Sequence, residues 1–247
     1  MGRHRSTAAL VALIAAPVLA GLAAIALAAP ADVAAGRRIA LGEAVGRELT
    51  CARCHGPRGT GDGSENVPRL AGQSRFYLRK QLEDFAFGAR PSGVMAPIAR
   101  ALTPEQWGDV AAYFESMEEV PHAPQAAADP FLLQRGGVLS AVGDPGRNVR
   151  ACEVCHADAG VGFPPSFPYL AGQHAGYTER QLLLWKRGVR DNDPLDVMAE
   201  IARVLSEEEI RALAVYFARL RPPPDSINSP IPVEPSALEP PPVRPRS

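Results

Sequence analysis

Cys51-Ala-Arg-Cys54-His55 recurs about 100 residues later as Cys152-Glu-Val-Cys155-His156. Further matches follow both motifs in the same order, and together they show that the chain repeats itself. They comprise Leu70-Ala71-Gly72-Gln73 with Leu170-Ala171-Gly172-Gln173, Ile98-Ala99-Arg100 with Ile201-Ala202-Arg203, and Tyr113-Phe114 with Tyr216-Phe217. Matches at this period indicate a duplicated small domain rather than a solenoid repeat.

The repeat predicts two tandem domains, at residues 31–119 and 131–220. Residues 120–130 are rich in proline and alanine and are expected to form a semi-extended linker. Residues 221–247 hold 10 prolines and are expected to be a disordered tail.

The Cys-x-x-Cys-His motif is typical of covalent haem attachment. Two thiols three positions apart lie on one helical turn and can form thioethers with one porphyrin, while the adjacent histidine reaches the iron. We therefore predict two covalently bound haem c groups. They are attached through Cys51, Cys54, Cys152 and Cys155, with His55 and His156 as axial iron ligands.

Three other interpretations of the cysteines fit less well. A zinc site would place its two cysteine pairs roughly 15–20 residues apart. A thioredoxin-like redox pair would need a βαβ context, which the sequence lacks. Two disulfides would leave the histidines in identical registers unexplained.

Two methionines occupy matching positions, in Val94-Met95-Ala96 and Val197-Met198-Ala199. Met95 lies 40 residues after His55, and Met198 lies 42 residues after His156. A methionine usually packs in a core, but the matched register favours a sixth iron ligand. We predict Met95 and Met198 as these ligands, each in a loop before the last helix of its domain. Met117 aligns with Leu220 and is expected in the core.

No segment is typical of a β-hairpin, so we predict an all-α fold. One helix precedes each cysteine pair, at 33–47 in the first repeat and, shorter, from Phe131 in the second, where Gly143, Pro145 and Gly146 interrupt it. A second helix is expected at 75–87 and 175–187, each stopped by glycine. The last helices begin at the capping boxes Thr103–Gln106 and Ser206–Glu209.

Residues 1–30 are typical of an export leader, with a basic start, an apolar run and a small-residue cleavage site. A signal peptide and an N-terminal anchor both remain open, because the apolar run is long enough to span a bilayer. We therefore expect a periplasmic protein, soluble or anchored to the inner membrane. The net charge is −1 and no basic stripe is interleaved with aromatics, so no nucleic-acid partner is expected.

Each half resembles a class I cytochrome c domain in the order of its helices, haem motif, Leu-Ala-Gly loop and distal methionine. The tandem resembles dihaem cytochromes c of the c4 type over about residues 33–220. The resemblance implies that the carbonyls of Pro68 and Pro168 accept from the imidazole N–H of His55 and His156, and so fix both rings. Gln73, Tyr77, Arg90 and their counterparts could bind haem propionates or simply pack.

Methionine and histidine together would fill both axial positions, which keeps substrates from the iron. This favours single-electron transfer between respiratory-chain partners, and no enzymatic activity. The donor would be a quinol-oxidising complex or a dehydrogenase, and the acceptor a terminal oxidase. Two alternatives stay open: an electron-accepting dihaem subunit of a dehydrogenase complex, and a dihaem redox enzyme, against which the matched methionines argue.

The two halves also differ. The second has three extra residues before its methionine, in the acidic stretch 191–196. The two haem pockets are therefore expected to differ, and the sequence leaves open which has the higher potential.

Overall fold

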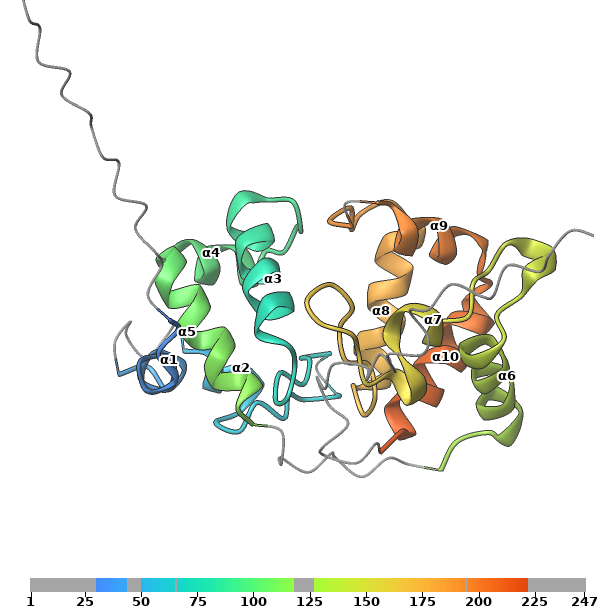
Figure 1. Cartoon of the computed structure of the whole chain (residues 1–247), viewed down its shortest axis with the longest axis horizontal. Coiled ribbons are helices and arrows are strands. Elements are labelled where there is room, and N and C mark those ends of the chain that lie inside the picture. The colour runs from blue at the N-terminus through green and yellow to red at the C-terminus, as the bar shows by residue number, and fades with distance from the viewer. Residues whose placement is uncertain (1–29, 44–49, 65, 118–126, 194, 222–247) are drawn as a thin grey trace, which may run out of the picture. The chain divides into compact units, whose positions relative to one another are not determined.

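The computed structural model describes residues 30–43, 50–64, 66–117, 127–193 and 195–221 (Figure 1). Within these ranges the chain is helical, and its only β-structure is three isolated bridges, such as Asp62 with Val67. The all-α prediction is confirmed. The expected leader, most of the linker and nearly all of the tail lie outside the described residues.

Each repeat builds its helices in the same order. The first contains α1 (Val33–Ala40), α2 (Cys51–His55), α3 (Arg75–Phe87), α4 (Met95–Arg100) and α5 (Pro104–Glu115). The second contains α6 (Pro130–Ala141), α7 (Glu153–His156), α8 (Ala175–Lys186), α9 (Val197–Val204) and α10 (Glu207–Arg219). Two short 3₁₀ turns, Pro145–Arg147 and Asp158–Gly160, flank α7.

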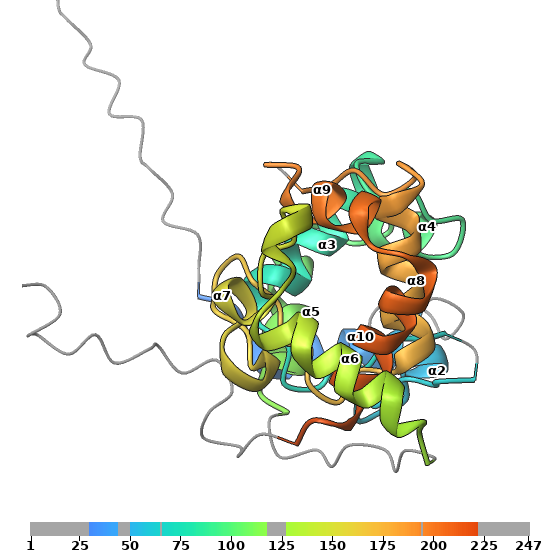
Figure 2. The ribbon, with the colours of Figure 1, turned by 90° about the vertical axis from the view of Figure 1, so that its right-hand side faces the viewer.

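The first and last helices of each repeat pack against each other, α1 on α5 and α6 on α10. Figure 2 shows the second of these pairs, α6 and α10, towards the viewer. Glycine allows this close approach. A Cβ atom on Gly36 would lie 2.0 Å from the carbonyl oxygen of Asp109, and one on Gly136 would lie 2.3 Å from that of Ala212. Any larger residue would force the backbones apart. The two cores then form around the last helices, with Phe114 and Phe217 buried in them.

The helix ends follow the sequence signals closely. Thr103 accepts from the N–H of Gln106, whose side chain accepts from the N–H of Thr103, and Ser206 and Glu209 form the same capping box. These pairs satisfy backbone donors at the helix starts. Helix α3 ends at Gly88, which adopts the left-handed conformation with φ 87°. The predicted starts of α5 and α10 and the stop of α3 are confirmed.

Three helix predictions need correction. The expected helix at 33–47 is described only as far as Ala40, followed by a turn, and residues 44–49 lie outside the described part. Its counterpart α6 has 12 residues against 8 in α1, so the prediction that it is the shorter one is wrong. The reason is that Gly143 lies beyond its end, while Pro130 opens it and Asp129 caps it. Third, Met95 and Met198 do not lie in loops: Met95 is the first residue of the short helix α4, and Met198 is the second residue of α9.

Candidate haem sites

Each Cys-x-x-Cys-His motif forms a single short helical turn. Helix α2 carries Cys51, Cys54 and His55, and α7 carries Cys155 and His156, with Cys152 at its N-cap. All four cysteines lie in the described part of the chain, and none pairs in a disulfide. Cys51 and Cys152 pack against the two cores. Burial raises the pKa of Cys51 to about 11 and that of Cys152 to about 12, whereas a reactive redox thiol needs a lowered pKa.

Both motif histidines are buried, and a proline carbonyl holds each ring. His55 Nδ1 lies 2.9 Å from Pro68 O, and His156 Nδ1 lies 2.9 Å from Pro168 O. A carbonyl oxygen can only accept, so Nδ1 carries the proton and the lone pair is left on Nε2. Burial lowers the pKa of both histidines. Each ring is therefore neutral and oriented, as an axial iron ligand needs to be.

The two matched methionines are held by their backbones at the start of a helix. The N–H of Met95 donates to Ser92 Oγ at 3.0 Å, and the N–H of Met198 donates to Asp193 Oδ2 at 2.6 Å. Met198 packs against the same core as Cys152. Met117 packs against the first core, as expected.

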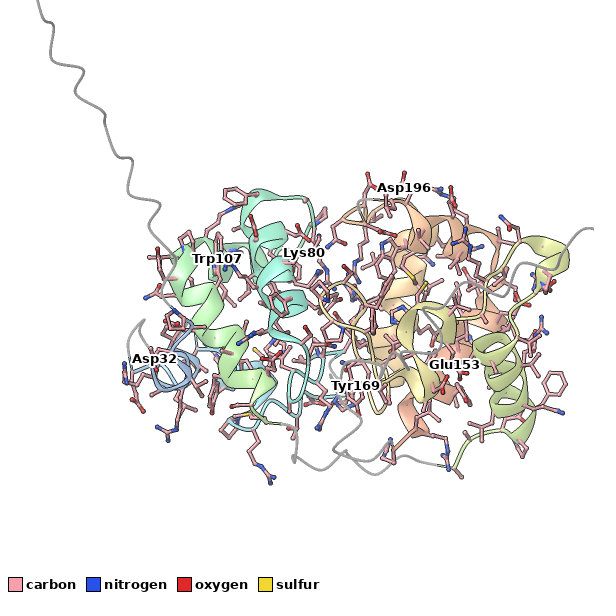
Figure 3. The ribbon with its side chains drawn as sticks, viewed as in Figure 1. Asp32, Lys80, Trp107, Glu153, Tyr169 and Asp196 are labelled. Atoms are coloured by element: carbon pink, nitrogen blue, oxygen red, sulfur yellow. The ribbon has the colours of Figure 1, made fainter. Side chains whose placement is uncertain are left out.

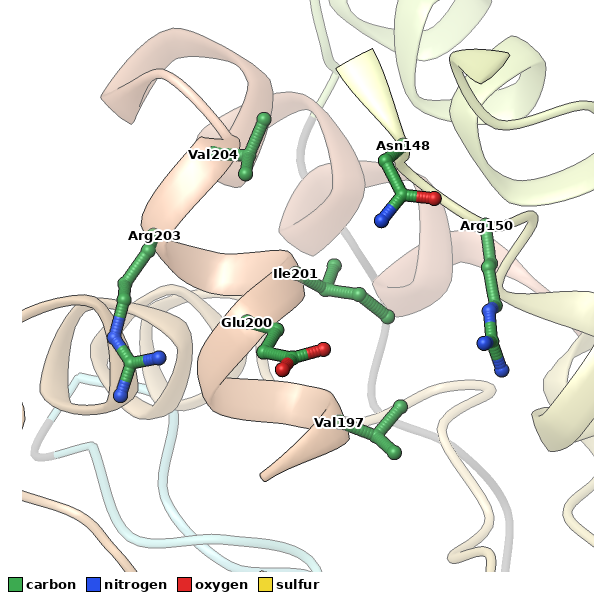
Figure 4. Close-up of a pocket in the computed structure, with 7 residues that line it drawn as sticks. All are labelled: Asn148, Arg150, Val197, Glu200, Ile201, Arg203 and Val204. Atoms are coloured by element: carbon green, nitrogen blue, oxygen red, sulfur yellow. The ribbon is translucent and has the colours of Figure 1, made fainter. Parts of the chain in front are cut away.

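A surface pocket lies in the second repeat, between the segment that leads to Cys152 and the helix that contains Met198 (Figure 4). One wall is Asn148 and Arg150, shortly before Cys152. The opposite wall is helix α9, through Val197, Glu200, Ile201, Arg203 and Val204. The segment leading to the cysteines and the methionine helix therefore face each other across a groove.

Two buried arginines connect the repeats. Arg90 donates to Gln81 at 2.8 Å, and across the repeats to Tyr177 at 2.8 Å and Gln181 at 2.6 Å. The other arginine makes the mirrored set. Arg190 donates to Gln181 at 2.9 Å, Asn192 at 2.8 Å, Gln81 at 3.2 Å and Tyr77 at 3.3 Å.

The cluster around Arg90 and Arg190 has the hydrogen-bond donors and the positive charge to bind an anionic group. Within the described residues no ion pair joins Arg90 or Arg190 to a carboxylate, although a buried charge is costly unless it is paired. Burial lowers the pKa of Arg190. The indole Nε1 of Trp185, whose ring lies 3.7 Å from the Arg190 guanidinium carbon, is buried without an acceptor. Haem propionates would supply such acceptor oxygens, so the residues present fit the expected group.

Gln73 and its counterpart lie elsewhere and contact the backbone of the opposite repeat. Gln73 pairs with Tyr169, a residue labelled in Figure 3, and Gln173 pairs with Arg69. His174 is also buried at this contact, with Nε2 2.8 Å from Thr60 O. The sequence had not indicated this role. Its only trace was the exact repetition of Leu-Ala-Gly-Gln.

Comparison with known proteins agrees with this arrangement. Residues 39–118 match the Cytochrome c family model. The chain is 44% identical over 206 residues to the thiosulfate dehydrogenase electron acceptor of Stutzerimonas stutzeri (strain A1501). The aligned residues cover 82% of this chain and 94% of that protein.

Two solved structures are similar. Reduced recombinant cytochrome c4 from Pseudomonas stutzeri superposes with a TM-score of 0.65 at 35% identity, covering 77% of this chain and 100% of that one. The thiosulfate dehydrogenase TsdBA from Marichromatium purpuratum superposes with a TM-score of 0.69 at 37% identity over 76% of this chain. This chain spans 40% of that longer one.

Proposed function

This chain belongs to the cytochrome c family, as a dihaem protein of the cytochrome c4 type, and from this premise we propose that it accepts electrons from a periplasmic dehydrogenase. It carries two covalently bound haem c groups and transfers single electrons. When bound, each haem supplies a one-electron couple at its iron. What the chain itself contributes is attachment, ligation, orientation and a contact surface for redox partners.

The proposed attachment uses Cys51 and Cys54 for one haem and Cys152 and Cys155 for the other. The proposed axial ligands are His55 with Met95 and His156 with Met198. Support comes from the hydrogen bonds of both histidines to proline carbonyls at 2.9 Å. In this proposal Pro68 and Pro168 fix the ring planes and the tautomer, which leaves Nε2 for the iron.

We also propose that the protein has no enzymatic activity of its own, on the basis of the same proposed ligand set. If methionine and histidine fill both axial positions, no substrate can bind the iron without displacing methionine. The backbone hydrogen bonds of Met95 and Met198 favour retention, because each methionine is tied to the start of a helix. The protein then exchanges electrons only.

The proposed donor is a thiosulfate dehydrogenase. The observation that carries this assignment is the 44% identity to a thiosulfate dehydrogenase electron acceptor over 94% of that protein's length. The onward acceptor would be a second redox protein, such as a terminal oxidase. The alternative of a fixed dehydrogenase subunit differs only in how permanent the contact with the donor is.

The proposed location is the periplasm, after export through the leader at residues 1–30. Among the helices that the structure describes, none has the length and apolarity to cross a bilayer. The proposed domains remain 31–119 and 131–220, with a linker at 120–130 and a tail at 221–247. Pro130 already belongs to helix α6, so the second folded unit begins by that residue.

Absorption spectra of the haem-loaded protein test the ligand set. We expect a methionine–iron charge-transfer band in the oxidised protein. It should fall by about half in Met95→Leu and in Met198→Leu, because each removes one of two sulfur ligands. Met117→Leu is the matched control, a core methionine whose replacement should leave the band intact. A full band in either ligand variant would refute the assignment.

Reduction kinetics test the partner. The oxidised protein is mixed with a thiosulfate dehydrogenase, with and without thiosulfate, and haem reduction is followed optically. We expect both haems to be reduced only when enzyme and thiosulfate are both present. Reduction by thiosulfate alone would make the protein an enzyme, and no reduction by the complete mixture would exclude this donor.

A further inference from the structure

The two matched methionines differ in the group that holds their backbone. Met95 N–H donates to the neutral hydroxyl of Ser92 at 3.0 Å. Met198 N–H donates to the carboxylate of Asp193 at 2.6 Å. Charge-assisted hydrogen bonds are shorter and roughly twice as strong as neutral ones. The second methionine is therefore held more firmly, and a negative charge lies directly at its backbone.

Asp193 is built into the turn before helix α9. Its backbone carbonyl accepts from Asp196 N–H at 3.0 Å, and its other carboxylate oxygen lies 3.5 Å from the N–H of Leu195. Asp196, labelled in Figure 3, is the N-cap of α9, and its backbone carbonyl accepts from Glu200 N–H at 2.8 Å. These bonds hold Asp193 so that one of its carboxylate oxygens accepts from the N–H of Met198.

The residues around the second methionine are also more negatively charged than those around the first. Residues 91–100 contain one arginine and no acidic residue, whereas residues 191–203 contain one arginine and four acidic residues. Three of those four, Asp191, Asp196 and Glu200, are exposed, so solvent and salt screen them. Asp193 is half-buried and hydrogen-bonded, so its charge is screened least.

The buried arginines that connect the two repeats do not distinguish the halves. Arg90 and Arg190 each donate to both Gln81 and Gln181, one from each repeat. They therefore bias both sites in the same direction. Lys80 forms an ion pair with Asp84 beside Asn192, which largely cancels their charges. Among the hydrogen-bond partners of the two matched methionines, the carboxylate at Met198 is the one charged group.

We propose that Asp193 is a positioning residue for Met198 and that its charge makes the second haem the one with the lower reduction potential. The proposal rests on the proposed function, because it requires Met198 as a ligand. An oxidised haem site carries one more positive charge than a reduced one, so a nearby carboxylate favours the oxidised state. A single electron on the protein then resides mainly in the first half.

Redox titration of the haem-loaded protein separates the charge effect from the ligand set. Asp193→Asn keeps an oxygen acceptor for the Met198 N–H and removes the charge. We expect it to raise the lower midpoint potential, by a several-fold change in that reduction equilibrium, and to leave the upper one in place. Ser92→Asp is the reciprocal variant and should lower the upper potential.

Asp191→Asn is the matched control, because it removes an exposed carboxylate from the same turn and should shift neither potential appreciably. The positioning role has its own readout. Asp193→Ala also removes the acceptor and should weaken the methionine–iron band of one haem.

The proposal fails if Asp193→Asn leaves both potentials in place or moves only the upper one, or if Asp193→Ala leaves the band unchanged. These outcomes can be told apart from failure of the proposed function. If the proposed ligand set were wrong, the wild-type protein itself would lack a methionine–iron band that corresponds to two haems.

Discussion

Gln73 and Tyr169 exchange two hydrogen bonds between the repeats: Gln73 Nε2 donates to Tyr169 O at 2.9 Å, and Tyr169 N–H donates to Gln73 Oε1 at 3.0 Å. Gln173 makes the same exchange with Arg69, at 2.9 Å in both directions. Each glutamine thus binds the backbone of the other repeat as a strand neighbour would. Because both copies contain the motif, duplication creates a self-complementary contact.

Replacing Gln73 with alanine should weaken this contact. The variant loses both hydrogen bonds to Tyr169, each contributing about 0.5–1.5 kcal/mol net, so we expect a loss of about 1–3 kcal/mol in the free energy of unfolding. Urea denaturation of the haem-loaded protein measures it. Gln134→Ala is the control, since Gln134 is exposed on helix α6. Equal stability of the two variants would contradict a role for Gln73 in joining the repeats.

The sequence predicted the elements whose signals are local. Helix α3 occupies the expected residues 75–87 because Gly88 stops it, and α5 begins at the Thr103 capping box. The haem motifs are equally local, since five consecutive residues make up each predicted attachment site. The methionine ligands were predicted only because Met95 and Met198 occupy matching positions in the two repeats. In a single repeat, either methionine would be indistinguishable from a core residue.

What the sequence did not predict depends on contacts between distant segments. Gln73 and Tyr169 are 96 positions apart, and no local pattern announces that they meet. The helical state of Met95 was missed because α4 is only 6 residues long and contains Pro97, and its first N–H is satisfied by Ser92 from outside the helix. Gly36 and Gly136 repeat in register, but their use at helix crossings shows only in three dimensions.

A second expectation concerns Gly36. A Cβ atom there would lie 2.0 Å from a backbone oxygen of helix α5, which a rotamer change cannot relieve. We expect Gly36→Ala to lower the free energy of unfolding by at least about 2 kcal/mol. Gly108→Ala is the control on α5, where the nearest atom would be 3.9 Å away. That variant should gain up to about 1 kcal/mol from helix propensity. Thermal unfolding of both variants checks the opposite signs.

Glu209 should make stability depend on acid pH. Hydrogen bonds from Arg147 hold the pKa of Glu209 at about 2, outweighing its burial, with help from the Ser206 N–H and Arg135. The pKa is lowered on folding, so the stabilisation is complete above the ordinary value near pH 4.5 and is lost as the pH falls towards 2.

Glu209→Gln isolates that contribution, because glutamine preserves the capping box just as Gln106 does in the first repeat. After allowance for solvent screening, we expect a loss on the order of 1–2 kcal/mol at neutral pH that disappears near pH 2. Glu208→Gln removes the same formal charge from an exposed position and should change little. A constant difference between wild type and Glu209→Gln from pH 7 to pH 2 would contradict the assignment.

Arg190 should raise the reduction potentials of both haems. Arg190 is 4% exposed, and its guanidinium donates to side chains of both repeats, including Gln81 and Gln181. A buried positive charge favours the reduced state of either haem, so Arg190→Gln should lower both midpoint potentials. Roughly 30–60 mV is expected for each, a three- to tenfold change for a one-electron couple.

Arg190→Lys keeps the charge, so both midpoint potentials should stay close to those of the wild-type protein. Arg187→Gln is the control, because Arg187 is exposed and paired only loosely with Glu207 at 3.7 Å. A titration in which only one haem responds to Arg190→Gln would show that the arginine serves a single repeat, and the shared network could not then balance the two halves.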